Sequence, residues 1–587
     1  MSATMIRTTM GMCPLLLCCA AGSAKVPGVL AHVPEDTAIY AVVPNVGSLL
    51  GDLSALNTAL AGKLPPEAAQ AGMGLFFAQS IVNQPGFDSE GSAAVIITPP
   101  EGGFDAGEPT VTALLPIADL EAFSKAPFMA GQNATFADGM ASVTMDADTL
   151  HMRDLGDYTV AGNDKDAIAA FQAGDFMQAH AKALGLSGMK AVTGSDLMFV
   201  ISVPAMDEQI AEGMANLEQQ AQFFAMMGGG DQVTQGFAAI KHAADTVRRD
   251  GSVVTFSADA AEDGISLDMG VSFREGTESA KSFMDASDSS ALMSKLPNEN
   301  YLVAYSMDAS SEGIGALMHA MAEMGGAQGM SMLVEGMTGA SGMIGTSPAA
   351  LGGAGLLSRQ ISYTRAADAG VAIESMATSL KEMNGQSLMG MKYETTYEAG
   401  AAEVNGVKVD AYSVKTSMDM GGEGGANPMG MMMDPAMINS MLFGMSGGPS
   451  GYVAKVDGGY YQTTSKNSEL LTSAINAGKG GEGLNASETL GKVSRKLQAG
   501  RFAEVFISMD QVVNTAGPFA QMMGMLDQFE PAPAVAPLGL SMAGTDGGLR
   551  GRIHMPAETL GFIIEFASQF EDPGMMGGDG MEGEPDF

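Results

Sequence analysis

The sequence predicts an α+β fold in which mostly antiparallel sheets carry packed helices. Short aliphatic segments come in runs, separated by Gly and Asp turns of the kind that join neighbouring strands. Amphipathic helical segments follow these runs and do not alternate with single strands, which argues against a doubly wound parallel sheet. The same series of segments occurs twice along the chain. Together these observations predict two related halves, at residues 28–290 and 291–570.

The first half is predicted to begin with a buried strand over residues 39–43, a few residues after Val33 and Pro34. Its aliphatic run has no polar alternation, which is typical of a strand covered on both faces. Further strands of the first half are expected at residues 94–98, 111–115, 141–144, 158–161 and 197–203.

Two helices are predicted after these strands. Ile210, Met214 and Leu217 share one face of a helix over residues 207–227, since their spacing follows the helical period. A second helix is expected over residues 235–249, and a hairpin turn over residues 259–264.

An internal duplication is the second part of the prediction. Four pairs of segments resemble one another in the same order along the chain, and an ordered self-similarity of this kind indicates a repeated unit. The separation between the copies grows in the second half, which indicates an insertion there, and the Met- and Gly-rich stretch 418–450 is the evident candidate. The pairs are 32–41 with 295–304, 150–160 with 453–461, 199–202 with 505–508, and 262–269 with 545–553.

The N-terminal residues 1–24 have the composition of a secretory signal peptide. Arg7 precedes a run of about ten apolar residues, followed by small residues, and the run is too short to span a bilayer. A lipid anchor on Cys18 or Cys19 is one alternative, and an uncleaved anchor or a wrongly placed start is another. All three cysteines lie in this segment, so a processed chain has no thiol. We therefore expect an exported protein of the periplasm, the cell envelope or the extracellular space.

The C-terminal segment 571–587 is predicted to be a disordered acidic tail. It contains six acidic residues and no cation, so it cannot bury enough apolar surface to order itself.

Composition excludes several classes of partner. Lys and Arg number 29 against 67 Asp and Glu, which gives a net charge of −38. Binding to nucleic acid requires a clustered basic face, so no nucleic-acid partner is expected. No segment after the N-terminus is long and apolar enough to be a transmembrane helix. An apolar ligand or a protein partner remains the expectation.

Motifs for catalysis and cofactor binding give no candidate. The six histidines are scattered and form no metal-binding pair, and two matches to the glycine-rich dinucleotide pattern lack the strand and helix that it needs. Acidic clusters near residues 146–148 and 259–264 do not follow the order of a calcium loop. We predict no catalytic residue and no cofactor from these motifs.

Methionine provides the one candidate metal site. The chain has 49 methionines, and Met433, Met437, Met441 and Met445 recur at a spacing of four. With Asp434 as N-cap and Pro435 at the first helical position, these thioethers would share one face of a helix. Thioethers are soft ligands that suit Cu(I) in a chain without thiols. The alternatives are a core or contact role, since Met is pliable and abundant throughout, and a groove for a hydrophobic ligand or partner.

The segment from Val33 to Thr37, with the strand after it and Asn45, is similar to a group of exported bacterial proteins of planctomycete type, whose function is unknown. Residues 114–119 and the segment after Gly156 carry the same resemblance, over about the first 175 residues. It implies an envelope location and repeated α+β units, and it transfers no site residue.

The sequence thus favours an exported, non-catalytic binding or structural protein of the bacterial envelope. A periplasmic methionine-rich Cu(I)-binding protein is the first alternative. A hydrolase whose site is assembled by the fold is the second.

Overall fold

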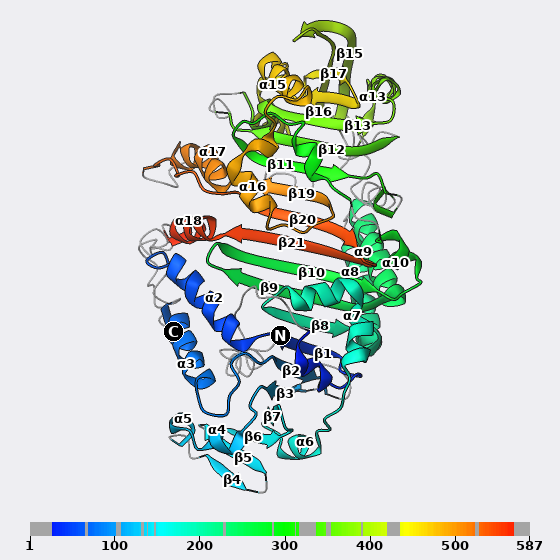
Figure 1. Ribbon diagram of the computed structural model, residues 1–587. Coiled ribbons are helices and arrows are strands. Elements are labelled where there is room, and N and C mark those ends of the chain that lie inside the picture. Colours follow the sequence, from blue (N-terminus) through cyan, green and yellow to red (C-terminus); the bar gives the residue numbers. More distant parts are fainter. Residues whose placement is uncertain are drawn as a thin grey trace, which may run out of the picture.

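One antiparallel sheet extends through the described part of the protein, with helices packed on its faces (Figure 1). The structure is a computed structural model that describes residues 26–64, 69–100, 107–130, 134–137, 139–145, 148–226, 231–284, 287–311, 313–315, 336–347, 354–388, 391–418, 435–522 and 528–568. The strands are β1 Ile39–Val43, β2 Ala93–Thr98, β3 Thr110–Leu115, β4 Thr135–Ala137, β5 Met140–Met145, β6 Asp148–Asp154, β7 Thr159–Gly162, β8 Leu197–Ser202, β9 Gly251–Ala261, β10 Gly264–Phe273, β11 Tyr301–Asp308, β12 Met337–Gly345, β13 Gln360–Ala366, β14 Ser387–Leu388, β15 Met391–Val404, β16 Val407–Met418, β17 Tyr452–Val456, β18 Gly459–Thr463, β19 Arg501–Ile507, β20 Leu538–Thr545 and β21 Gly548–Pro556.

The hydrogen-bonded neighbours form a single linear order, and every pairing between these strands is antiparallel. From one end of the molecule to the other the order is β4-β5-β6-β7-β3-β2-β1-β8-β9-β10-β21-β20-β19-β11-β12-β13-β18-β17-β16-β15-β14. The pairing of β10 with β21 joins the strands formed before residue 290 to those formed after it.

The strands on the two sides of this junction follow the same chain order. Counted outward from β10, the neighbours are β9, β8, β1, β2, β3, β7, β6, β5 and β4. Counted outward from β21, they are β20, β19, β11, β12, β13, β18, β17, β16 and β15, with the two-residue β14 added at the edge.

Several helices begin directly after a strand, at a residue whose side chain caps them. Asn45, Asp164, Asp368 and Asn467 each accept a hydrogen bond from a backbone N–H of the first turn, which satisfies a donor that the helix leaves free. The helices are α2 Val46–Ala59, α3 Ala69–Val82, α4 Leu120–Ser124, α5 Pro127–Ala130, α6 Lys165–Ala170, α7 Met177–Thr193, α8 Asp207–Met226, α9 Asp231–Asp250, α10 Glu278–Ser282, α11 Ser290–Met293, α13 Ala369–Met383, α14 Pro435–Phe443, α15 Ser468–Gly478, α16 Glu488–Ser494, α17 Met509–Met522 and α18 Ala557–Ser568.

One face of the sheet is covered by α6, α7, α15 and α16, and we call it the α7/α16 face. In its first half Leu184 and Val192 of α7 pack on Met198 and Val200 of β8. In its second half the buried residues of α15 and α16 pack with Phe506 of β19 and the neighbouring strands. The burial of these aliphatic side chains supplies the main favourable free energy of the fold.

On the opposite face, the helices of the described ranges cover the sheet mainly toward its two ends. There α2, α3 and α4 pack on β1, β2 and β3, and α13 packs on β13, β17 and β18. The strands between these two groups, near the β10–β21 junction, keep apolar side chains exposed on this face.

The fold class predicted from sequence is confirmed: the protein is α+β with an antiparallel sheet. The predicted strand at residues 39–43 corresponds to β1, and the predicted helices correspond to α8 and α9. The helices α2, α3 and α7 were not predicted. The segments 1–24 and 571–587, with Cys18 and Cys19, lie outside the described residues, so the signal peptide, the lipid anchor and the disordered tail stay predictions.

Candidate functional site

Strand β10 has an inverted distribution of polar and apolar side chains. Ser266 and Asp268 point to the α7/α16 face and are buried, whereas Leu267 and Met269 point to the opposite face and are 50% and 58% exposed. A solvated sheet face normally carries the polar residues, and the packed face normally carries the apolar ones. The strand is therefore polar where it is packed and apolar where it is open.

The neighbouring strands continue this open apolar surface. In the strand register Phe199 lies opposite Phe256, and Phe256 lies opposite Met269. Across the junction, Leu267 lies opposite Ile553. The six large exposed side chains of this surface, on five neighbouring strands, are Phe199 (38%), Phe256 (41%), Leu267 (50%), Met269 (58%), Met542 (36%) and Ile553 (39%), and we call them the open apolar patch.

Gly551 occupies the middle of the patch. It lies between Met269 on β10 and Met542 on β20, and it adds no side chain. A Cβ at this position would meet no atom closer than 3.8 Å, so the space above the glycine is open.

Two small hydrophobic clusters, one near each end of the strands, bound the patch. At one end Leu56 of α2 and Leu60, the residue after this helix, pack with Leu560 of α18 over Ile265. At the other end a separate cluster includes Phe283 and Ile314 with Leu549. The patch therefore has defined limits along the strands, and the exposed side chains lie between two packed rims.

The α7/α16 face of the same strands carries a buried ion pair. Asp268 accepts hydrogen bonds from Nε and Nη2 of Arg552, each at 2.7 Å, and from Nε2 of Gln498 at 2.9 Å. The side chains of Asp268 and Arg552 are 4% and 18% exposed. A second buried pair joins Arg501 to Glu504, where Ser306 also donates to the carboxylate and burial raises the pKa of Glu504. Because buried charges are costly unless paired, these contacts hold the polar residues in place.

His554 belongs to the same face and is buried at the end of β21. Its Nδ1 lies 3.0 Å from the hydroxyl of Ser266, and burial lowers the pKa of the imidazole to about 4. The ring is thus neutral at neutral pH, as burial away from water favours.

The structure places the predicted methionine cluster only in part. Pro435 is the first residue of α14, as predicted, but the helix ends at Phe443, so Met445 lies in the following 3-10 turn, Gly444–Ser446. The prediction that one helix continues through Met445, and places this residue on the same face as the others, was therefore wrong. Met441 is 49% and Met445 is 94% exposed. Met433 lies outside the described residues, the side chain of Met437 is not described, and the Cu(I) site stays a prediction.

Within the described ranges there is no group of three or more His, Cys, Asp or Glu side chains arranged to hold a metal ion. The same ranges contain no helix with the length and apolar character needed to cross a membrane.

Comparison of the chain with family models, with curated proteins and with solved structures finds no match. The geometry of the candidate site is therefore the basis for any function assigned to it.

Sequence reasoning missed every residue of the open apolar patch. The alternation of Ser and Asp with Leu and Met over residues 264–273 shows that one face of β10 is polar and the other apolar. It does not show which face is packed. By the usual rule the apolar face would be assigned to the core, and only the arrangement of the helices reverses that assignment.

Proposed function

We propose that the protein is an exported, non-catalytic binding protein that holds a neutral, long-chain apolar ligand on its open apolar patch. The observation that carries this proposal is the run of Phe199, Phe256 and Met269, which are exposed side by side on three neighbouring strands. Large contiguous apolar surfaces on soluble proteins mark ligand or partner sites, because leaving them in water costs free energy.

The chemistry of the patch favours an aliphatic ligand over a protein partner. Its side chains are aliphatic, thioether or phenyl, and none of the six has a hydrogen-bond donor or a strong acceptor. Protein interfaces carry about one hydrogen bond per 100–200 Å² and have a polar rim. Thioether side chains are also pliable, so Met269 and Met542 can adapt to a flexible chain.

We also propose that the two series of strands arose by duplication of one unit. The identical strand order on the two sides of the β10–β21 junction supports this proposal, as do the four resembling segment pairs. The turns 262–263 and 546–547 each join two strands through two residues. A ligand on the patch would then lie where the two units meet.

Export is the third part of the proposal. The composition of residues 1–24 supports it, together with the similarity of the first 175 residues to exported bacterial proteins of planctomycete type. It places the protein in the periplasm, the cell envelope or the extracellular space.

The binding proposal is tested with the full chain and a neutral probe. N-phenyl-1-naphthylamine should fluoresce on binding, and 1-dodecanol should displace it. Leu267→Glu places a charge in the middle of the patch and should weaken probe binding by about tenfold or more, because the charge must be desolvated under the ligand. Leu186→Glu is the matched control, since Leu186 of α7 is 65% exposed but lies outside the patch.

Equal binding by the wild type and Leu267→Glu would overturn the proposal. So would gel filtration showing a wild-type dimer that Leu267→Glu dissociates, because a second copy of the chain would then cover the patch. A loss of probe binding in Leu267→Glu alone, with both variants folded by circular dichroism, supports it.

A further inference from the structure

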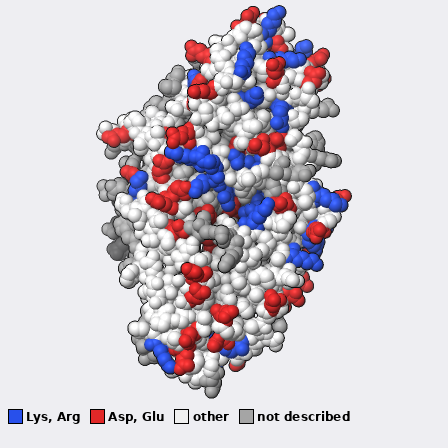
Figure 2. All heavy atoms as spheres, in the orientation of Figure 1, with Lys and Arg blue, Asp and Glu red and all other residues white. Residues whose placement is uncertain are grey.

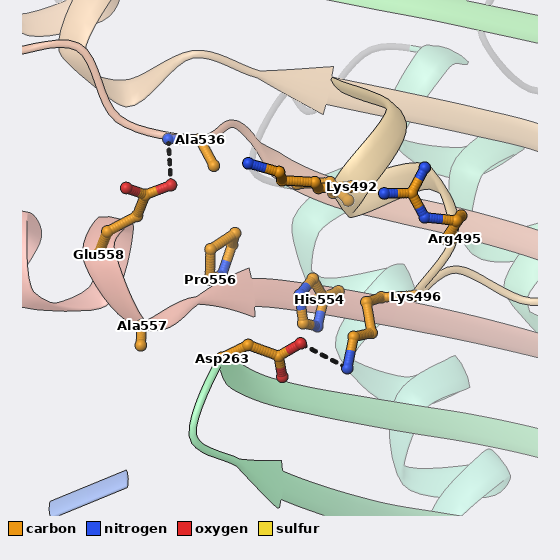
Figure 3. A pocket seen from close by; sticks show the side chains of 10 residues that line it. Asp263, Lys492, Arg495, Lys496, Ala536, His554, Pro556, Ala557 and Glu558 are labelled. Carbon is orange, nitrogen blue, oxygen red and sulfur yellow. Dashed lines mark hydrogen bonds and ion pairs between the residues drawn. The ribbon is translucent and has the colours of Figure 1, made fainter. Parts of the chain in front are cut away.

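A cavity lies on the side of the sheet opposite to the open apolar patch, between α16 and the start of α18 (Figure 3). Its volume is about 460 Å³, which is sufficient for a small organic molecule. Lys492, Arg495 and Lys496 line it from α16 and the turn that follows, and His554 of β21 lies beneath them.

These three cations line one cavity in a chain that has few cations. The protein has only 29 Lys and Arg residues and a net charge of −38. Figure 2 shows a concentration of blue atoms over the region of α16, where the surface is otherwise mostly uncharged or acidic. Local positive charge in an acidic protein raises the concentration of small anions at that place.

Existing contacts leave much of this charge available. In the described part of the chain, the Arg495 guanidinium has no ion pair or hydrogen bond. Its Nη1 lies beside Gly491, where an added Cβ would be 3.7 Å away. Lys492 pairs with Glu488 at 3.0 Å, but both side chains are more than half exposed, so water screens the pair. Lys496 pairs with Asp263 at 2.6 Å.

The remaining lining residues are mostly apolar. Val493 comes from α16, Ala536 from the segment before β20, and Pro556 and Ala557 from the junction of β21 with α18. Two carboxylates also line the cavity. Asp263 is paired with Lys496, and an oxygen of Glu558 accepts a hydrogen bond from the backbone N–H of Ala536 at 3.1 Å.

We propose that this cavity binds a small organic carboxylate. The carboxylate of the ligand lies against Arg495 and Lys492, whose N–H groups donate charge-assisted hydrogen bonds, and the guanidinium fork fits two carboxylate oxygens. Its short aliphatic part lies against Val493, Ala536 and Pro556. The site is non-covalent, and the neutral ring of His554 adds no charge to the cavity.

This inference is independent of the proposed function, because the two sites use different residues on opposite faces of the sheet. Leu267→Glu alters only the open apolar patch, so it should leave the binding of a small carboxylate unchanged. Failure of one proposal can therefore be distinguished from failure of the other.

The test is binding of sodium butyrate to the full chain, followed by saturation-transfer difference NMR. Arg495→Gln and Lys492→Gln should each raise the dissociation constant about tenfold or more, since each removes a charge-assisted hydrogen bond. Arg495→Lys keeps the charge but loses the fork, so we expect a smaller loss. Lys165→Gln is the matched control, because Lys165 is exposed at the start of α6, outside the cavity.

Three results would overturn the proposal. The first is no detectable butyrate binding by the wild type. The second is equal affinity in the wild type, Arg495→Gln and Lys492→Gln. The third is tighter binding of inorganic phosphate than of butyrate, because the apolar wall would then contribute nothing. Butyrate binding that falls in Arg495→Gln and Lys492→Gln, and persists in Lys165→Gln and Leu267→Glu, supports it.

Discussion

The two faces of the central strands differ in a way that reverses the usual pattern. On the α7/α16 face, Asp268 of β10 and His554 of β21 are buried, and the side chain of Arg552 is only 18% exposed. On the opposite face the same two strands expose Leu267, Met269 and Ile553. A sheet stabilised by burial alone would have the opposite arrangement.

From this difference we expect the two faces to have separate roles. The polar groups of the packed face are paired with one another, so they fix the junction of β10 with β21 in one register. The open face contributes little to stability in its present state, because its side chains are still in contact with water. We therefore expect substitutions on the packed face to change stability, and substitutions on the open face to change binding.

The largest effect should come from Asp268→Ala. The change leaves Arg552 and Gln498 without the carboxylate that they contact, and removing one partner of a buried pair costs about 3–5 kcal/mol. Urea denaturation would measure the loss of unfolding free energy. Asp263→Ala is the control, since its pair with Lys496 has side chains 55% and 44% exposed, and we expect a loss below about 1 kcal/mol. Equal losses in the two variants would show that burial of the Asp268–Arg552 pair adds nothing to its effect on stability.

The next effect concerns the pH dependence of stability. Burial lowers the pKa of His554 from 6.5 to about 4, so the unfolded chain takes up this proton more readily than the folded one. The unfolding free energy should therefore fall as the pH decreases from about 6.5 to about 4. At pH 4 the loss should reach about 3 kcal/mol.

Urea denaturation at several pH values, on the wild type and His554→Gln, isolates this contribution. The variant should lose less stability between pH 7 and pH 4, because the glutamine does not titrate. Burial also lowers the pKa values of His32 and His180, but both residues are present in the two proteins and cancel in the difference. His242→Gln, at an exposed position, should behave as the wild type. Parallel pH profiles for the wild type and His554→Gln would show that the buried imidazole has no such effect.

Much of the architecture could be predicted from sequence because it depends on local patterns. The aliphatic run of β1 and the amphipathic spacing of α8 each have a period that identifies the element. In contrast, α2 and α3 have weak segregation of apolar residues around the helix, since nearly all their residues are apolar or small. Their period therefore gives no signal, and their packing on the sheet decides their conformation.

The candidate sites could not be predicted because they depend on long-range pairing. Leu267 and Ile553 are far apart in sequence and become neighbours only when β10 pairs with β21. The cavity near α16 likewise combines Asp263 with Lys496 and His554. A methionine-rich helix was the one local signal that pointed to a site. The exposed methionines of the open apolar patch come instead from β10 and β20, where they have no neighbouring methionine in the sequence.

Oxidation of the patch methionines should have the smallest effect on stability. It should nevertheless weaken the binding of an apolar ligand. Met269 and Met542 are 58% and 36% exposed, whereas Met152 and Met343 are 1% and 0% exposed. Dilute hydrogen peroxide should therefore convert the first two to sulfoxides well before the second two, as peptide mass spectrometry would measure. Because the patch is already in water, the unfolding free energy should change by less than about 0.5 kcal/mol. A sulfoxide is polar, however, so binding of N-phenyl-1-naphthylamine should weaken.

Leucine at both positions separates this effect from oxidation elsewhere. Met269→Leu/Met542→Leu keeps the apolar surface but cannot be oxidised, so its probe binding should survive peroxide. Met445, which is 94% exposed outside the patch, should still be oxidised in that variant and serves as an internal control. If the leucine variant lost probe binding to the same extent as the wild type, the ligand would not contact the open face. If oxidation instead lowered the stability of the wild type by several kcal/mol, the patch would belong to the packed core, and the contrast between the two faces of β10 and β21 would be wrong.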